Sequence, residues 1–210
     1  MADTKLRIEV WSDYVCPFCY LEFPILERLQ RERGQQVSVT WRAYELRPDP
    51  VPTLDPDGEY LHCVWNQSVY PMARERGLAL KLPPVQPRSR KAHEATAFAG
   101  EHGRSDAMLE ALFRAFFEQG RDIGDVVVLQ DVASSVGLDP SELGEALGAG
   151  RYTARVLEDQ RIAQEIGITG VPATLLHHGS GQGQAMLLSG AVPYASLEAA
   201  VERALRQAGN

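Results

Sequence analysis

Two cysteines, Cys16 and Cys19, stand where a strand pattern gives way to a helix pattern, and this arrangement constrains the fold more than any other feature of the sequence. Residues 6–11 alternate between apolar and charged side chains, which predicts a strand. Residues 17–33 begin with proline and carry apolar side chains at helical spacing, which predicts a helix. A second strand is predicted over residues 36–46. The first part of the chain is therefore expected to form a βαβ unit.

The middle of the chain has a different character. Residues 47–58 are rich in proline and aspartate and predict an irregular boundary segment. Helical patterns follow almost without interruption over residues 60–166. Glycines at expected helix ends and polar residues at expected helix starts punctuate them, namely Gly103, Gly120 and Gly137 as C-caps and Ser105, Asp125 and Asp139 as N-caps.

The strand character returns near Gly167. Two short β-like runs flank the glycine-rich residues 179–184 and predict a hairpin, and an amphipathic helix is predicted over residues 193–207. We therefore predict an α/β fold in which a large all-helical segment is inserted between the halves of a small sheet domain. The expected domains are residues 1–58 together with 167–210, and the inserted helical domain of residues 59–166.

Composition narrows the classes of function. The 210 residues carry a formal charge of -7 and give a pI of about 5.3, so the surface repels phosphate backbones and acidic lipids. Three cysteines are too few for a secreted disulfide framework. The first residues show no secretory signal, and no apolar run approaches the roughly 20 residues that span a bilayer. We expect no nucleic-acid or membrane binding, and a cytoplasmic protein.

The cysteine spacing predicts redox chemistry. Residues three apart on a helix lie on one face, within the roughly 5.5 Å Cα separation that a disulfide prefers. Cys16 is expected at the helix start, where free backbone N–H groups and the helix dipole stabilise a thiolate. Cys16 is therefore the expected attacking thiol, and Cys19, one turn deeper, would displace the captured substrate.

Other readings of the cysteines are weaker. A structural zinc site needs four ligands, and neither Cys63 nor the five histidines has suitable spacing, so we expect no metal. Cys63 is expected to pack in a helical segment. Carboxylates near a thiol can accept its proton, and of the candidates Asp13, Glu22 and Glu45, Asp13 stands nearest to Cys16 in the sequence.

A second short motif, Gly170-Val171-Pro172, leads into the β-like run ATLLHH. With it, the chain resembles the DsbA-like thioredoxin-fold oxidoreductases, most closely their FrnE-like branch. The resemblance is carried mainly by SDYVCPFCYLEFPILERL and by GITGVPATLL, with YELRPDP, KAHEATAFAGEHG and LEALFRAFFEQGRDIGD between them. It implies a thioredoxin fold, a cis-proline at Pro172, and a Val171 backbone that pairs with an extended substrate.

The same resemblance also implies a function. It implies a thiol–disulfide oxidoreductase that exchanges disulfides with protein or peptide substrates, with no cofactor other than the cysteine pair. Phe18, Tyr20 and Val171 are candidates for an apolar lip that contacts the substrate. A histidine between the cysteines is typical of strongly oxidising DsbA proteins, and Pro17-Phe18 stands there instead, which predicts a less oxidising couple.

Two alternatives stay open. The architecture also resembles kappa-class glutathione transferases and 2-hydroxychromene-2-carboxylate isomerases, so glutathione is a candidate partner. In those enzymes serine is typical at the position of Cys16, and the second thiol of this chain argues against them. The other alternative is a chaperone-like binder of extended chains whose cysteines are incidental. The sequence leaves open whether the chain is a monomer or a homodimer.

Overall fold

The centre of the protein is a mixed sheet of four strands in the order β2-β1-β3-β4. The structure, a computed structural model, describes residues 6–178 and 185–207. β1 (Leu6–Ser12) pairs in parallel with β2 (Val37–Ala43) and antiparallel with β3 (Ala173–His178), which pairs antiparallel with β4 (Met186–Ser189). The predicted α/β fold, with strands from both ends of the chain in one sheet, is confirmed.

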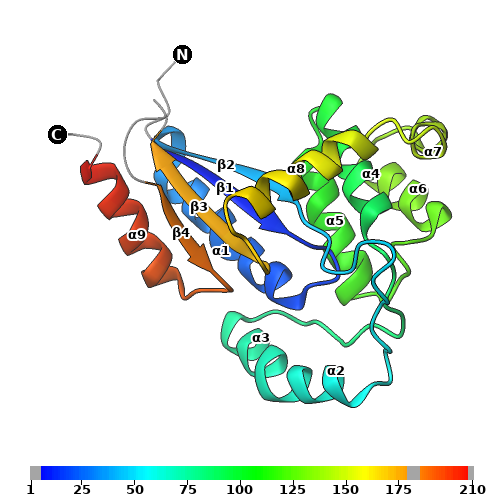
Figure 1. The fold of residues 1–210 in the computed structure, drawn as a ribbon, viewed down its shortest axis with the longest axis horizontal. Coiled ribbons are helices and arrows are strands. Elements are labelled where there is room, and N and C mark those ends of the chain that lie inside the picture. Colours follow the sequence, from blue (N-terminus) through cyan, green and yellow to red (C-terminus); the bar gives the residue numbers. More distant parts are fainter. Residues whose placement is uncertain (1–5, 179–184, 208–210) are drawn as a thin grey trace.

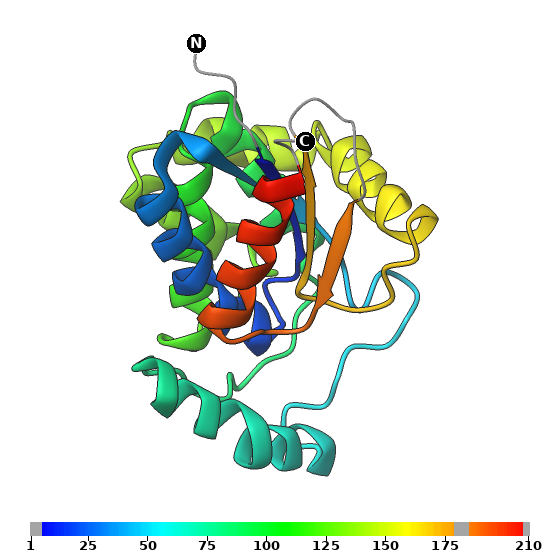
Figure 2. The same cartoon turned by 90° about the vertical axis from the view of Figure 1, so that its left-hand side faces the viewer.

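Because side chains alternate along β1, they pack against different helices on the two faces of the sheet. Leu6, Ile8 and Val10 are buried against α1 (Pro17–Arg33) and α9 (Tyr194–Gln207). Trp11 points to the opposite face, and its Nε1 donates a hydrogen bond of 3.0 Å to a carbonyl of α8 (Thr153–Glu165). Figure 2 shows α1 and α9 on one side of the sheet and α8 on the other. The strand nearest the cysteines is therefore held from both sides.

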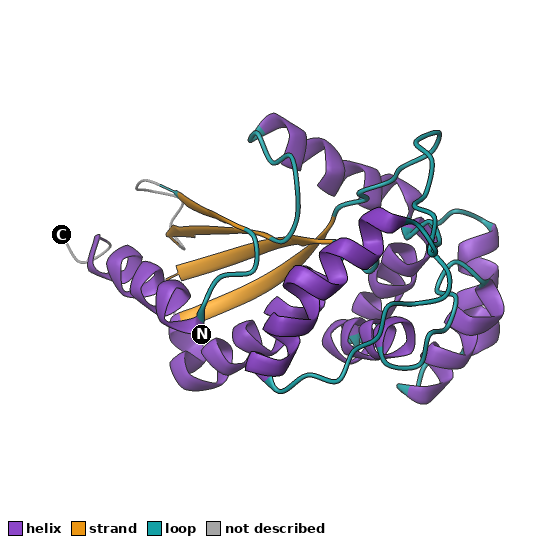
Figure 3. Cartoon of the chain, turned by 90° about the horizontal axis from the view of Figure 1, so that it is seen from below, coloured by secondary structure: helices purple, strands orange, loops and turns teal. Residues whose placement is uncertain are grey.

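Helices fill the chain between β2 and β3. Figure 1 shows α2 and α3 apart from the group formed by α4 to α7, and Figure 3 shows the strands at one end of the molecule. In chain order they are α2 (Glu59–Val64), a π-helical turn (Trp65–Val69), α3 (Tyr70–Arg76), α4 (Arg90–Glu101), α5 (Ser105–Phe117), α6 (Val126–Ser135), α7 (Pro140–Gly148) and α8.

The predicted helix caps are partly confirmed. The Asp125 carboxylate accepts a hydrogen bond from the Val127 N–H, and the Asp139 carboxylate accepts from two N–H groups at the start of α7. The prediction for Ser105 is wrong, because Ser105 is already the first helical residue and the cap position belongs to Arg104, whose side chain makes no cap hydrogen bond. Glycines with positive φ follow three of these helices, at Gly103, Gly120 and Gly137.

The helical segment shares its core with α1. The ring of Phe113 on α5 lies 5.1 Å from that of Tyr14, 5.4 Å from that of Tyr20 and 6.3 Å from that of Phe23, measured between centroids. The first of these partners precedes the cysteines and the other two lie on α1. The helices thus fix the face of α1 that the sheet does not cover. The domain boundaries proposed from the sequence stay a prediction.

Three details of the chain ends and turns complete the fold. β2 ends at Ala43, earlier than predicted, although the Tyr44 N–H still donates to the Ser12 carbonyl at 3.0 Å. The glycine-rich turn predicted at 179–184 lies outside the described residues. Across the part of the chain that is described, no helix has both the length and the apolar character needed to cross a bilayer.

Candidate active site

Cys16 is the residue at which the chain enters α1. It holds the N-cap position with φ -92° and ψ 111°, no side chain caps the helix there, and Pro17 follows in the first turn. Pro17 has no N–H to leave unsatisfied, and its fixed φ suits a helix start. The sulfur of Cys16 therefore lies beside the positive end of the α1 dipole, the position predicted for the attacking thiol. Only 4% of Cys16 is exposed.

Cys19 lies one turn deeper and is fully buried. Its backbone N–H donates to the Cys16 carbonyl at 3.1 Å, and its Sγ accepts a hydrogen bond of 3.5 Å from the Asp13 N–H. Burial, together with the neighbouring Cys16 sulfur, raises the pKa of Cys19 well above its usual value. Cys16 and Cys19 are both free thiols in this structure. Cys19 is thus shielded from solvent.

Asp13 lies in the loop of residues 13–16 that leads from β1 to the start of α1, here called the cysteine loop, and it contacts both cysteines. Its carbonyl accepts the Cys16 N–H at 3.1 Å, while its own N–H points to Cys19. The carboxylate is fully buried and accepts the Leu46 N–H at 2.7 Å, which ties this loop to the segment after β2. Asp13 is therefore placed by these contacts to position the two cysteines.

Val171 and Pro172 face Cys16 from the other half of the chain. The Cys16 thiol donates to the Val171 carbonyl at 3.4 Å, across 155 positions of sequence. The Val171–Pro172 peptide bond is cis, and Pro172 immediately precedes β3. The pairing of β3 with β1 brings these two segments together, because Ala173 lies opposite Trp11 at the end of β1 that leads to the cysteines.

An apolar groove opens beside Cys16. It has a volume of about 270 Å³ and lies between the start of α1, the irregular segment after β2, and α2. Phe18 and Val171, two of the three candidates for an apolar lip, line it. Leu46 and Tyr60, two large side chains with 38% and 64% exposure, stand at its edge. The polar residues Arg47 and Gln86 also line it. The groove was not predicted, because it depends on α2 folding back toward Cys16.

Two expectations need correction. Tyr20 does not line the groove: its ring stacks with that of Phe117 at 5.7 Å between centroids, and its hydroxyl donates to Glu118 at 2.6 Å. Tyr20 therefore has a packing role, because it points from α1 into the helical segment. The prediction that Cys63 is packed is also wrong, since Cys63 is exposed on α2.

The other candidate carboxylates are engaged away from the thiols. Glu22, buried on α1, pairs with Arg76 of α3 at 3.2 Å, and Glu45 pairs with Arg90 of α4. Sequence reasoning missed His93 of α4, whose Nε2 lies 3.5 Å from the Asp13 carboxylate. A helical pattern gives no signal for this contact, which joins residues 80 positions apart in the chain. Within residues 6–178 and 185–207, no cluster of His, Cys, Asp or Glu is arranged to hold a metal ion.

Comparison with known proteins places this geometry in a family. The model of the DSBA-like thioredoxin domain matches residues 7–202. A curated relative, the uncharacterized protein YwbO of Bacillus subtilis strain 168, is 34% identical over 175 residues, which cover 81% of this chain and 86% of the relative. The probable DsbA oxidoreductase SCO1869 of Streptomyces coelicolor is 27% identical, with a TM-score of 0.77, over 96% of this chain and 91% of its own.

Two more distant solved structures share the fold. The cytosolic disulfide reductase DsbM of Pseudomonas aeruginosa, also solved with GSH, is 22% identical, with a TM-score of 0.71, over 94% of this chain and 100% of its own. A 2-hydroxychromene-2-carboxylate isomerase is 21% identical, with a TM-score of 0.79, over 96% and 97% of the two chains. Since the family model spans almost all of the sheet and the helical segment, the chain belongs to the DSBA-like thioredoxin domain family.

Proposed function

We propose that this protein is a thiol–disulfide oxidoreductase that acts on protein or peptide substrates through Cys16 and Cys19. One observation carries the proposal: the Cys16 sulfur, at the start of α1, lies 3.4 Å from the Val171 carbonyl and faces the apolar groove, while Cys19 is buried behind it. This arrangement supports a Cys16 that meets the substrate and a Cys19 that attacks Cys16 from behind. The contact with Val171 and the groove beside Cys16 favour these roles over a pair of incidental core thiols.

The proposed reaction has two exchange steps. In the reducing direction, the Cys16 thiolate attacks one sulfur of a substrate disulfide, a Cys16–substrate bond forms, and the other substrate sulfur leaves as a thiolate with the electron pair of the broken bond. Cys19 then attacks Cys16, the Cys16–Cys19 disulfide forms, and the second substrate sulfur leaves. Each leaving thiolate takes up a proton, so the substrate gains two electrons and two protons. The oxidising direction is the reverse of these steps.

The groove supports an extended substrate with an apolar side chain beside its cysteine. A chain that pairs with the Val171 backbone would pass Phe18 and enter the space edged by Leu46 and Tyr60. The side chain of Arg47 in the same groove would favour a carboxylate of a short peptide, which keeps glutathione among the candidate partners. The exposed free thiol of Cys63 is consistent with a reducing compartment, and we propose the cytoplasm.

Trapping with single cysteine variants tests this proposal. Cys19→Ser should form a mixed disulfide that it cannot release, so non-reducing gels and mass spectrometry should show substrate bound at Cys16. Wild type should reduce insulin disulfides with dithiothreitol as the electron source, and Cys16→Ser should not. Cys63→Ser, which removes a thiol outside the pair, is the matched control and should keep full activity. Equal insulin reduction by wild type and Cys16→Ser would refute the proposal.

The same variants separate the alternatives. Glutathione-dependent transfer or isomerisation that survives in Cys16→Ser would favour the glutathione-linked enzymes, in which serine is typical at this position. Suppression of aggregation by the Cys16→Ser, Cys19→Ser double variant, without any exchange activity in wild type, would favour a chaperone-like binder.

A further inference from the structure

His93 belongs to the helical segment and lies near the cysteine loop. It has a buried polar atom that makes no hydrogen bond within the described part of the chain. It lies on α4, its side chain is 6% exposed, and its Nε2 has no hydrogen-bond partner among the described residues. That atom lies 3.5 Å from Asp13 Oδ1, on a carboxylate with no exposed surface. A polar atom that is buried without a hydrogen bond is costly, so this one needs an explanation.

The contacts of Asp13 connect this histidine to the cysteines. Asp13 donates its N–H to the Cys19 sulfur at 3.5 Å and accepts the Cys16 N–H at 3.1 Å. The Asp13 carboxylate and the Cys19 sulfur are both fully buried, and the backbone of Asp13 links the two groups. When Cys19 loses its proton, a second negative charge forms there, which burial makes unfavourable.

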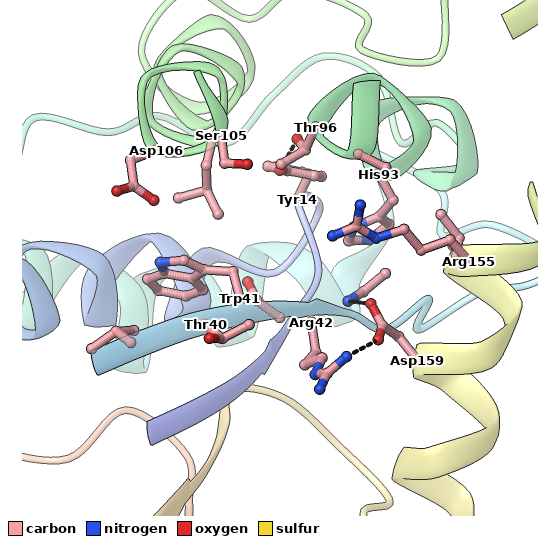
Figure 4. Close-up of a pocket in the computed structure, with 16 residues that line it drawn as sticks. Tyr14, Thr40, Trp41, Arg42, His93, Thr96, Ser105, Asp106, Arg155 and Asp159 are labelled. Carbon is pink, nitrogen blue, oxygen red and sulfur yellow. Dashed lines mark hydrogen bonds and ion pairs between the residues drawn. The ribbon is translucent and has the colours of Figure 1, made fainter. Parts of the chain in front are cut away.

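A cavity meets His93 on its other side. It has a volume of about 190 Å³ and lies between β2, α4, α5 and α8, with Tyr14 and His93 in its lining (Figure 4). The ring of His93 lies 4.8 Å from that of Tyr14, whose hydroxyl pairs with Thr96. Volume and polar lining are sufficient for water, which needs polar partners and about 15 Å³ of room. His93 thus stands between the dry cysteine loop and a space that can hold water.

We infer that His93 is a positioning residue that balances the charge of the Asp13 carboxylate while Cys19 loses its proton, and that it exchanges protons with the cavity. The inference rests on the proposed function and adds a residue to its second step. A proton held on His93 offsets the negative charge as the Cys19 thiolate attacks the mixed disulfide at Cys16. The proton that Cys19 loses passes to water, and the substrate thiolate takes one proton from water as the Cys16–Cys19 bond forms and the Cys16–substrate bond breaks. His93 then returns its own proton to the cavity.

The other ionisable groups around His93 define the control. Tyr14 joins Asp13 on the loop, Asp106 of α5 lines the cavity, and Asp159 of α8 pairs with Arg42 of β2 at 2.9 Å. Arg155 of α8 extends toward His93 in Figure 4 and also lines the cavity. Arg155→Gln removes a cation from the same cavity without touching Asp13, so it tests whether any cavity cation has the same effect.

The second exchange step can be timed with dithionitrobenzoate. The reagent reacts with Cys16 and releases one thionitrobenzoate, and attack by Cys19 on the mixed disulfide releases another, each visible at about 412 nm as a separate phase. All variants carry Cys63→Ser, because the exposed third thiol would also react. A Cys19→Ser variant identifies the second phase by removing it.

His93→Gln should slow the second phase at least about tenfold near pH 7 and move its half-maximal pH upward. This is less than the roughly 10²–10⁴-fold effect of a direct acid–base partner, because His93 acts through Asp13. The first phase should change by less than about twofold. Adding Asp13→Asn, which removes the charge that His93 offsets, should restore much of the second-phase rate. Arg155→Gln should leave both phases unchanged.

The outcomes distinguish the two proposals. If wild type shows no second phase, the proposed function fails. If wild type shows both phases and His93→Gln changes neither the second rate nor its pH dependence, the role of His93 is wrong while the function stands. An equal loss in Arg155→Gln would also overturn the assignment to His93. Should His93→Gln fail to fold, His93→Asn and a pH profile of the wild-type second phase test the same point: a rate that rises with pH only as Cys19 ionises, with no second titrating group, contradicts it.

Discussion

At the scale of single residues, two thiols three positions apart are made unequal by their surroundings. Cys16 ends the loop and begins α1, whereas Cys19 lies inside, where burial raises its pKa well above the usual value. The residues between them then decide how strongly the protein oxidises, because stabilising the Cys16 thiolate favours the reduced protein. The side chains of Pro17 and Phe18 offer no charge or polar hydrogen to that thiolate.

The first prediction at this scale concerns the reduction potential. The wild-type couple should be clearly more reducing than the roughly -120 mV of DsbA, and Phe18→His should raise the potential, because an imidazolium beside Cys16 stabilises its thiolate. Equilibration with glutathione buffers measures both values. Phe18→Leu keeps an apolar side chain in the groove and should stay near wild type. A wild-type potential at the DsbA value would contradict the prediction.

At the scale of elements, α1 is fixed to α3 by one buried ion pair. The Arg76 side chain donates to the Leu21 carbonyl at 2.7 Å, to the Val192 carbonyl at 3.0 Å and to the Glu22 carboxylate at 3.2 Å. Burial raises the pKa of Glu22 to about 7, against a lowering by Arg76, and its Oε1 has no hydrogen-bond partner. The negative charge on Glu22 therefore destabilises the contact between α1 and α3, the two helices that place α2 beside the groove.

This cost predicts a pH dependence of stability. Because the folded-state pKa of about 7 lies above the ordinary 4.5, the folded protein binds this proton more tightly than the unfolded chain. The stability that this bound proton gives the folded protein is complete below about pH 4.5 and is lost as the pH rises through about 7. Above that pH the free energy of unfolding is lower by about 3 kcal/mol. Glu22→Gln cannot ionise, so its free energy of unfolding should exceed that of wild type more at about pH 8 than at about pH 4.5.

Urea unfolding at the two pH values measures this difference. Glu75→Gln, an exposed residue of α3, is the matched control and should follow wild type at both. A difference between Glu22→Gln and wild type that is the same at both pH values would show that Glu22 does not titrate in this range.

At the scale of the whole molecule, the sheet and the helical segment are joined by shared packing. Phe113 of α5 has no exposed surface and contacts aromatic rings from the cysteine loop and from α1. On the other side of the sheet, Arg42 of β2 pairs with Asp159 of α8 at 2.9 Å and also with Glu9 of β1. Because these contacts are shared, neither the sheet nor the helical segment has a complete hydrophobic core by itself.

The prediction at this scale is a single cooperative unfolding. Phe113→Ala should lower the free energy of unfolding by about 3–5 kcal/mol, because it leaves a cavity where the two parts meet. Loss of helical circular dichroism and exposure of Cys19 to alkylation should then occur at the same denaturant concentration. Tyr60→Ala, at a side chain that is 64% exposed, should cost less than about 0.5 kcal/mol. Two separate transitions would support an independently folding helical domain instead.

The sequence by itself determined the elements and the reactive pair. Alternation predicted β1, apolar spacing predicted α1, and the position of Cys16 and Cys19 at the start of that helix predicted an outer and an inner thiol. These features depend on neighbours within a few residues. The same local logic failed for Ser105, where the helix begins one residue after Arg104. It failed again for Cys63, whose apolar neighbours in sequence do not decide which face of α2 is covered.

Only the tertiary structure decided what surrounds those sulfurs. The approach of Val171 to Cys16 follows from the antiparallel pairing of β3 with β1, and the groove follows from the return of α2 to the start of α1. The pair formed by Asp13 and His93 joins a loop to a helix of the inserted segment. Such contacts join residues far apart in the chain, and the pattern of a single segment carries no information about its partner, since many packings bury the same apolar face.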